Sequence, residues 1–314
     1  MNRGEGRGTV ITVGTFDGVH CGHRLILRRM EEIACTEGLE RVIYAFAFPP
    51  RFSLDGERSG LLLPEQAKVA LLARCAERVE RADFQAVSGV DAVCFARDHL
   101  IRKFSAQVIV VGERFRFGRG RSGDIPLLRR IGEEEEVRIV TVPPLLSDGG
   151  MVSSTRIRSL LHEGKIAATA ALLGRPPLLI GRVLHGDRLG RELGYPTANL
   201  AIDPAILLPA TGVYLVHAFW DDGGGAGILY IGDRPTLKRS EMRCEVHLFS
   251  PQRTDFYEQK LEVHMLDRLR GDRAFPSLVA LRQQIDRDVA CAHSLLAARN
   301  EEPHPIFTLK STPG

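Results

Sequence analysis

The sequence has no long apolar run. Nowhere among its 314 residues do about 18 uncharged apolar residues follow one another, which is the length that a membrane-spanning helix needs. The first eight residues are polar and run directly into an apolar segment, so they lack the apolar core and the cleavage site of a signal peptide. We therefore expect a cytoplasmic protein with no membrane partner.

Paired cysteines are also missing. The six cysteines stand at positions 21, 35, 75, 94, 244 and 291, and no two of them form a CxxC pair. This scatter is not the spacing of a disulfide framework or of a zinc site. We expect free or buried thiols, as in a reducing compartment.

Neither sign of charge is in clear excess. The 42 basic and 39 acidic residues leave a net charge of +3, which gives no electrostatic basis for wrapping DNA or binding a membrane surface. With 44% apolar and 26% charged residues, the composition is that of an ordinary soluble globular protein. No internal repeat is present, and the length favours two domains.

The first half of the chain alternates between strands and helices. The pattern predicts strands over residues 9–14, 41–48, 107–112 and 137–142, and helices over residues 23–35, 64–78, 153–164 and 165–173. Strands separated by helices indicate a parallel sheet with helices on both faces.

The second half has closely spaced strands without helices between them, which is typical of an antiparallel barrel or sandwich. The predicted strands cover residues 178–186, 212–220, 227–232, 243–249 and 260–266, and a helix follows over residues 277–299. We place the domain boundary near residues 174–178. The predicted domains are residues 1–174 and 175–300, followed by a loose polar tail over residues 301–314.

The sharpest motif is residues 14–23, GTFDGVHCGH, between a predicted strand and a predicted helix. A helix start offers free N–H groups and a positive dipole end to an anion. His20 and His23 flank this entry, and Gly22 lets the backbone approach closely. Such a loop suits a triphosphate attacked at its α-phosphorus, because imidazoles can donate hydrogen bonds to the developing charge. The alternative is a turn with two surface histidines.

Two further segments have phosphate- or ligand-binding character. Ser154, Thr155 and Arg156 lie at a predicted helix start, where hydroxyls and a guanidinium favour phosphate; the alternative is a plain N-cap with a solvated arginine. Residues 112–124 mix arginine, phenylalanine and glycine after a buried strand, which indicates a ligand loop at the strand's carboxyl end. The same mixture could form an RNA-binding tract.

With these motifs in this order, and LLGRP at residues 172–176, the first half resembles that of bacterial bifunctional riboflavin kinase/FMN adenylyltransferases (FAD synthetases). The resemblance implies a nucleotidyltransferase-type α/β domain that joins FMN to the AMP part of ATP and releases pyrophosphate. It makes His20 and His23 the catalytic, phosphate-contacting pair. The implied nucleotide- and flavin-binding residues are Gly14, Phe16, Asp17, Gly22, Arg114, Phe115, Phe117, Ser154, Thr155 and Arg156.

Two positions depart from the family pattern in this half. Arg114 stands where the family usually has Asp or Asn, and residues 45–50, AFAFPP, replace the usual TFxPHP. Both departures lie where substrates are expected. They leave open a riboflavin kinase whose first domain is inactive or has an altered specificity.

The second half contains a glycine-rich motif over residues 181–199, GRVLHGDRLGRELGYPTAN. Such a loop can wrap phosphates with backbone N–H groups, while Thr197 and Asn199 offer the hard oxygen ligands that Mg²⁺ prefers. It is not a Walker A loop, since GKS and GKT are absent. The alternative is a glycine-rich hairpin. The candidate binding residues are Gly181, Gly186, Gly190, Gly194 and Pro196.

This string, with residues 212–214, 231–236 and 245–248, closely resembles the riboflavin kinase signature. The resemblance implies a six-stranded antiparallel barrel that transfers the γ-phosphate of ATP to the ribityl 5′-hydroxyl of riboflavin. It assigns Thr197 and Asn199 to the Mg²⁺–nucleotide contacts, and Glu245 to the carboxylate that orients or deprotonates the hydroxyl. Tyr230 and Glu258 depart from the family, which has Asn and Gly there.

Together these motifs predict a flavin-cofactor enzyme that makes FMN from riboflavin and then FAD from FMN. Its partners would be the small molecules riboflavin, FMN and ATP, with Mg²⁺ and without nucleic acid. No covalent enzyme intermediate is expected, and the sequence does not indicate an oligomeric state. The alternative of a different class is a non-catalytic flavin-binding protein that keeps the fold.

Overall fold

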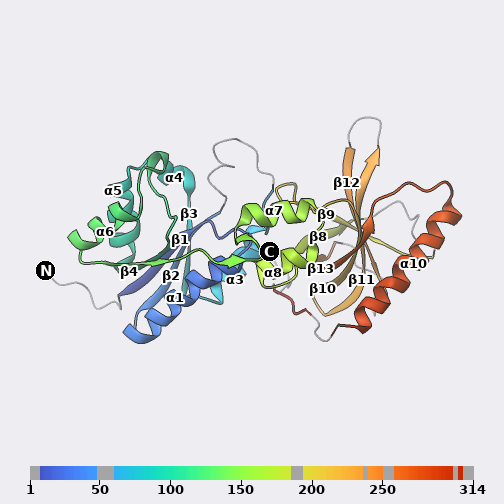
Figure 1. The fold of residues 1–314 in the computed structure, drawn as a ribbon, viewed down its shortest axis with the longest axis horizontal. Coiled ribbons are helices and arrows are strands. Elements are labelled where there is room, and N and C mark those ends of the chain that lie inside the picture. Colours follow the sequence, from blue (N-terminus) through green and yellow to red (C-terminus); the bar gives the residue numbers. More distant parts are fainter. Residues whose placement is uncertain are drawn as a thin grey trace. The chain divides into compact units, whose positions relative to one another are not determined.

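The computed structural model describes residues 8–47, 60–184, 194–235, 240–249, 258–299 and 303–306. The chain divides into two compact units, which we describe separately (Figure 1). The first unit comprises residues 1–61 and 65–154, and the second comprises residues 62–64 and 155–314.

The first unit is built on a five-stranded sheet in the order β3-β2-β1-β4-β5, and every neighbouring pair is parallel. The parallel α/β fold expected from the sequence is therefore confirmed. Because the strands are parallel, their carboxyl ends lie along one edge of the sheet. The strands are β1 (Thr9–Gly14), β2 (Glu40–Phe46), β3 (Arg78–Ala82), β4 (Ala106–Gly112) and β5 (Arg138–Val142).

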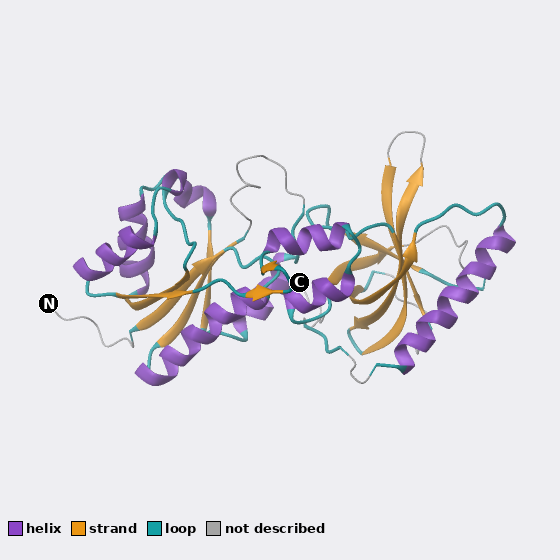
Figure 2. Cartoon of the chain, in the orientation of Figure 1, coloured by secondary structure: helices purple, strands orange, loops and turns teal. Residues whose placement is uncertain are grey.

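Helices cover both faces of this sheet (Figure 2). Helix α1 (Cys21–Glu37) lies on one face, and α4 (Phe84–Ser88), α5 (Ala92–Cys94) and α6 (Ile125–Glu134) lie on the other. The remaining elements are α3 (Glu65–Ala73), the π-helical η1 (Phe95–Arg102), the 3₁₀ turn η2 (Arg119–Arg121) and the hairpin of β6 (Leu146–Ser147) and β7 (Gly150–Met151).

Strand β3 corrects one prediction, because the sequence pattern had continued a helix from residue 64 to residue 78. The helix ends at Ala73, and β3 begins at Arg78. This strand lies at the edge of the sheet and reads RVERA, and only Ala82 in it is buried. An edge strand so rich in charge lacks the apolar run by which the interior strands were identified.

The second unit contains a closed barrel in the order β10-β11-β12-β9-β8-β13, with every neighbouring pair antiparallel. This confirms the six-stranded antiparallel barrel. The strands are β8 (Leu178–Leu184), β9 (Ala198–Ile202), β10 (Gly212–Trp220), β11 (Gly223–Pro235), β12 (Ser240–Leu248) and β13 (Lys260–Gly271).

Among the described residues the second unit has three helices, although α7 begins one residue before it. They are α7 (Ser154–His162), α8 (Ile166–Leu173) and α10 (Leu278–Ala297). The backbone N–H of Ala210 donates to the Leu161 carbonyl at 3.0 Å, and α8 packs on β13. The compact units thus divide within the first turn of α7, whereas the sequence pattern changes after α8. The functional boundary at residue 174 stays a prediction.

Helix α10 lies against the barrel (Figure 2), where it packs on β11 and β13. Its residue Ala292 belongs to the buried cluster there, and the chain end described beyond α10 also contacts the barrel. Ile306 is buried, and its N–H donates to the buried Glu262 carboxylate at 2.7 Å. At residues 303–306 the structure therefore differs from the loose tail that we expected. A buried carboxylate needs hydrogen-bond donors, and the tail supplies one of them. No helix of the described residues is long and apolar enough to cross a membrane.

Candidate active sites

The loop between β1 and α1 brings the two histidines of the first motif into contact. His20 caps α1, since its Nδ1 accepts the His23 backbone N–H at 3.3 Å. The two rings stack with their centroids 3.6 Å apart and their planes 14° from parallel. Because Nδ1 of His20 is an acceptor, a neutral His20 ring carries its proton on Nε2. The helix thus begins two residues earlier than the sequence pattern suggested.

His23 occupies a position that disfavours protonation. Burial lowers the pKa of His23 well below its usual value of 6.5, and nearby His20 and Lys68 lower it further. The Nδ1 atom of His23 is buried, and no described residue forms a hydrogen bond with it. The imidazole of His23 is therefore neutral at neutral pH.

The backbone of this loop is strained. Phe16 has φ of 49° and Val19 has φ of 42°, which are left-handed conformations of non-glycine residues. Each costs about 1–3 kcal/mol, and such strain clusters at ligand sites. The Phe16 side chain is buried and meets the His23 ring edge-on at 5.3 Å between centroids. The surrounding core thus holds the histidines in place against the local strain.

Two glycines of the motif are required by the aromatic rings around them. A Cβ at Gly22 would lie 3.2 Å from the His20 ring, and a Cβ at Gly14 would lie 3.3 Å from the Phe16 ring. Both distances are shorter than ordinary van der Waals contact. The glycines therefore let the histidine loop fold back closely over the end of β1.

The second motif joins the first through one hydrogen bond. The Ser154 hydroxyl donates to the backbone carbonyl of Asp17 at 2.9 Å, and Asp17 is itself buried. Thr155 and Arg156 follow in the first turn of α7, where Thr155 is exposed and Arg156 is partly exposed. The structure thus brings Ser154 to the histidine loop. The phosphate-binding role of Thr155 and Arg156 stays a prediction.

The third segment divides into core and surface residues. Phe117 is 4% exposed and belongs to the core, and Phe115 stacks on it with centroids 5.4 Å apart. Arg114 is exposed, whereas Arg116 pairs with Asp124 at 3.3 Å. Core packing accounts for Phe117, so its predicted contact with a ligand has no support from its surroundings. The unusual residue of the segment, Arg114, faces solvent.

Replacing Arg114 by Asn tests that residue. We expect FAD formation to persist and the affinity for FMN or ATP to fall about tenfold, because a guanidinium pairs with phosphate oxygens and an amide does not. Titration calorimetry of each ligand, with FAD synthesis rates, measures this. The control is Arg28→Asn, which removes the same charge from an exposed position on α1. A gain of FAD synthesis in Arg114→Asn would mean that Arg114 impairs the site, and unchanged affinities would make it a surface residue.

In the barrel, Glu245 lies between the groups that the kinase motif predicted. Its Oε1 accepts from Arg243 Nη1 at 3.0 Å, and its Oε2 accepts from the Thr197 hydroxyl at 3.4 Å. Asn199 on β9 pairs directly with Glu245 on β12. Closure of the barrel between β9 and β12 thus brings together residues separated by more than 40 positions in the sequence.

Tyr230 and Asp272 form a second polar pair beside Glu245. Tyr230 on β11 pairs in register with Glu245 on β12. The Tyr230 hydroxyl lies 3.3 Å from each carboxylate oxygen of Asp272. Burial, Asp272 and Glu245 raise the pKa of Tyr230 to about 12. The phenol therefore stays protonated and donates to Asp272. A Cβ at Gly232 would strike the Tyr230 hydroxyl at 2.0 Å, so this arrangement requires glycine there.

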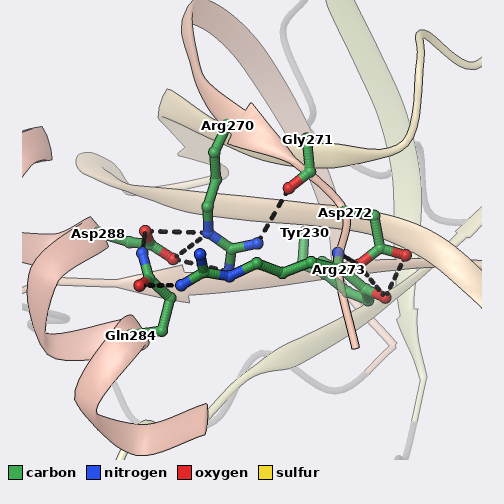
Figure 3. A network of polar contacts seen from close by, with 7 residues as sticks. All are labelled: Tyr230, Arg270, Gly271, Asp272, Arg273, Gln284 and Asp288. Atoms are coloured by element: carbon green, nitrogen blue, oxygen red, sulfur yellow. Dashed lines mark hydrogen bonds and ion pairs between the residues drawn. The ribbon is translucent and has the colours of Figure 1, made fainter. Parts of the chain in front are cut away.

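The pair belongs to a network that the sequence analysis missed (Figure 3). Arg270 Nε lies 2.9 and 3.0 Å from the two carboxylate oxygens of Asp288, which is buried on α10. Gln284 donates to the same carboxylate at 2.7 Å and accepts from Arg273. These bonds fix α10 to the end of β13 next to Asp272. In the sequence, only the four-residue spacing of Gln284 and Asp288 indicates a contact of this network, because residues one helical turn apart are neighbours.

The glycine-rich motif is described in part. Gly181 lies where a Cβ would come within 2.7 Å of Ile202, so its small size serves the packing of β8 on β9. Gly194 has φ of 87°, and the Pro196 carbonyl lies 2.9 Å from His247 Nδ1. Gly186 and Gly190 lie outside the described residues, as do Phe48 and Pro49 of the segment that departs from the family pattern.

The donor atoms near Glu245 suit Mg²⁺ and not a transition metal. Thr197, Asn199 and Glu245 offer hydroxyl, amide and carboxylate oxygens, which are hard ligands. No cluster of three or more His, Cys, Asp or Glu in the described part of the chain could hold a metal ion. Mg²⁺ commonly uses one or two protein oxygens together with water and substrate phosphates, so this small oxygen set is sufficient for it.

Comparisons with known proteins cover both halves. Residues 3–156 match the FAD synthetase family and residues 173–296 match the riboflavin kinase family. A bifunctional riboflavin kinase/FMN adenylyltransferase of Pseudomonas fluorescens is 37% identical over 302 residues, with 94% of this chain and 95% of that protein covered. Its counterpart in Escherichia coli K12 is 33% identical over 295 residues, with 92% and 93% covered. A crystal structure described as a macrolide-efflux protein from Streptococcus pneumoniae is 29% identical, with a TM-score of 0.82 over 92% of this chain and 95% of that one.

Proposed function

The chain belongs to the bifunctional riboflavin kinase/FMN adenylyltransferase family, and on that basis we propose that it phosphorylates riboflavin to FMN and adenylylates FMN to FAD. The observation that carries this proposal is that each half keeps its reacting groups in contact. His20 stacks on His23 in the first half, and Thr197 contacts Glu245 in the second. Six free thiols and the use of ATP suit the cytoplasm.

For the kinase reaction, Glu245 is the proton acceptor. The ribityl 5′-hydroxyl of riboflavin gives its proton to the Glu245 carboxylate as its oxygen bonds to the γ-phosphorus of ATP, and the bond to the β-phosphate oxygen breaks to release ADP. The Thr197 hydroxyl and the Arg243 guanidinium orient the carboxylate from its two sides. Thr197 and Asn199 would hold Mg²⁺, which neutralises phosphate charge when it is bound.

For the adenylyl transfer, the histidine pair stabilises charge. A phosphate oxygen of FMN attacks the α-phosphorus of ATP, the bond to the β-phosphate oxygen breaks, and pyrophosphate leaves. Negative charge accumulates on the oxygens around the α-phosphorus, and His20 and His23 donate hydrogen bonds to them. Ser154, Thr155 and Arg156 would hold the departing phosphates. Each step transfers a group directly between substrates, so no enzyme nucleophile is needed.

We expect the two activities to be separable, because the histidine pair lies in the first unit and Thr197 and Glu245 lie in the second. We expect a fragment of residues 175–314 to make FMN from riboflavin but no FAD. This fragment loses the Ala210–Leu161 hydrogen bond and the packing of α8 on β13, so a fragment of residues 155–314 should melt at a higher temperature. Chromatography of products and thermal melts test this. A folded fragment of either length that lacks kinase activity would contradict the modular arrangement.

The whole proposal is tested by incubating the protein with riboflavin, ATP and Mg²⁺ and separating the products by chromatography. Formation of FMN followed by FAD supports it. FMN without FAD would favour a kinase whose first domain is inactive or takes another acceptor, the alternative that Arg114 motivates.

A further inference from the structure

Lys68 is a buried lysine at the adenylyl-transfer site that none of the motifs contains. It is 3% exposed, and its ammonium donates to the backbone carbonyls of Phe46 at 2.5 Å and Ala47 at 2.8 Å. Lysine is rarely so deeply buried, because desolvating an ammonium costs several kcal/mol. The two hydrogen bonds to carbonyl oxygens offset only part of that free-energy cost, because an ammonium has three N–H donors.

The ammonium lies where the carboxyl ends of two strands meet. Phe46 ends β2 and Ala47 follows it, while Gly14 ends β1 directly beside Ala45 in the parallel register. The histidine loop starts at that end of β1. Lys68 therefore connects α3 to the part of the sheet from which His20 and His23 are displayed.

The charged groups that act on Lys68 come from the histidine loop, α3 and β3. Burial lowers the pKa of Lys68, the carboxylates of Asp17 in the histidine loop and of Glu65 on α3 raise it, and Arg81 on β3 lowers it. In turn the charge of Lys68 lowers the pKa of His23. The ammonium and the histidine pair thus share one electrostatic environment, although α3 belongs to none of the sequence motifs.

We propose that Lys68 is a positioning residue for adenylyl transfer, whose buried ammonium fixes the end of β2 beside the histidine loop and makes the site electropositive towards substrate phosphates. This inference rests on the adenylyltransferase function proposed above. Lys68 itself transfers no group: it acts through the backbone that it holds and through the charge that it places near His23.

The experiment compares Lys68→Met and Lys68→Arg with Lys103→Met in the full chain. Lys103 is a matched control because it lies on the surface of the same unit, where it pairs with Glu80 at 2.9 Å. We expect Lys68→Met to lower the rate of FAD formation from FMN about 100-fold, the typical cost of a small misplacement of reacting groups. FMN formation in the same sample should stay at the parental rate.

A spectroscopic readout separates this role from simple packing. Without the ammonium, one of the causes that lower the pKa of His23 is gone, so its NMR titration should move to higher pH in Lys68→Met. Lys68→Arg keeps the charge, so its His23 titration should stay low and its FAD formation should exceed that of Lys68→Met at least tenfold. Lys103→Met should match the parent in every measurement.

Three results would overturn the inference: parental FAD formation in Lys68→Met, an unmoved His23 titration in that variant, or equal losses in the Arg and Met variants. If Lys68→Met does not fold, the titration and activity of Lys68→Arg decide, and a His23 titration moved to higher pH there would count against the inference. If the parent makes no FAD, the proposed function fails, whereas the His23 titrations still test the influence of Lys68.

Discussion

His23→Ala is expected to lower FAD formation from FMN about 100- to 1,000-fold, the usual cost of removing one donor to a developing negative charge. FMN formation should not change, because Glu245 and Thr197 lie in the other unit. The reason is geometric, because His23 stacks on His20 at the start of α1, where a phosphate would accept hydrogen bonds from the pair. Product chromatography with riboflavin and with FMN as separate substrates measures both rates.

The control for this variant is His162→Ala, which removes an exposed imidazole at the end of α7. Its FAD formation should equal that of the parent. Parental FAD formation by a folded His23→Ala protein would exclude His23 from catalysis. A loss of FMN formation as well would show that the two units do not work independently.

Glu245→Gln should slow FMN formation about 100- to 10,000-fold, the range for loss of a proton acceptor. The amide keeps the size of the side chain and can still accept from Thr197, but it cannot take the proton of the riboflavin hydroxyl. It also removes the negative charge that pairs with Arg243 at 3.0 Å. FAD formation from supplied FMN should remain at the parental rate in the same assay series.

Glu258→Gln supplies the matched change in the same barrel, at an exposed carboxylate that pairs with Arg182 on the surface. We expect that variant to keep its kinase rate. A kinase rate for Glu245→Gln within a few-fold of the parent would reduce Glu245 to a structural residue of β12.

Interior strands could be predicted from the sequence because most of their residues are apolar. Residues 9–14 and 212–220 have the expected bounds as β1 and β10. The sequence pattern missed one strand of the five-stranded sheet and one strand of the barrel, besides the short hairpin of β6 and β7. Strand β3 is charged because it lies at the sheet edge, and β9 is short and carries Asn199 within a motif that indicated a loop. The apolar pattern of a sequence indicates which strands are buried. Neither β3 nor β9 has the apolar run that burial on both faces of a sheet produces.

The sites follow a similar rule. The sequence motifs predicted His20, His23, Thr197 and Glu245 because these candidate residues lie on short, specific strings. The residues around them come from distant segments: Asp272 reaches Tyr230, and Asp17 receives the Ser154 hydroxyl, only through the folded sheets. Nothing local in the sequence specifies such contacts.

Lys68 left one signal that could have been used. It lies three and four residues before Leu71 and Leu72, and therefore on the buried face of α3. A lysine on an apolar helix face usually extends its ammonium to solvent. The sequence alone therefore does not indicate that the Lys68 ammonium is buried. The burial of Lys68 became evident only with the carbonyls at the end of β2.

The central claim is that one chain carries out two successive reactions, and the time course of both products tests it most directly. The full-length protein is incubated with riboflavin, excess ATP and Mg²⁺, and samples are separated by chromatography with flavin fluorescence detection. We predict that FMN appears first and that FAD follows at its expense. Accumulation of FMN without FAD, or riboflavin that stays unchanged, would contradict the account.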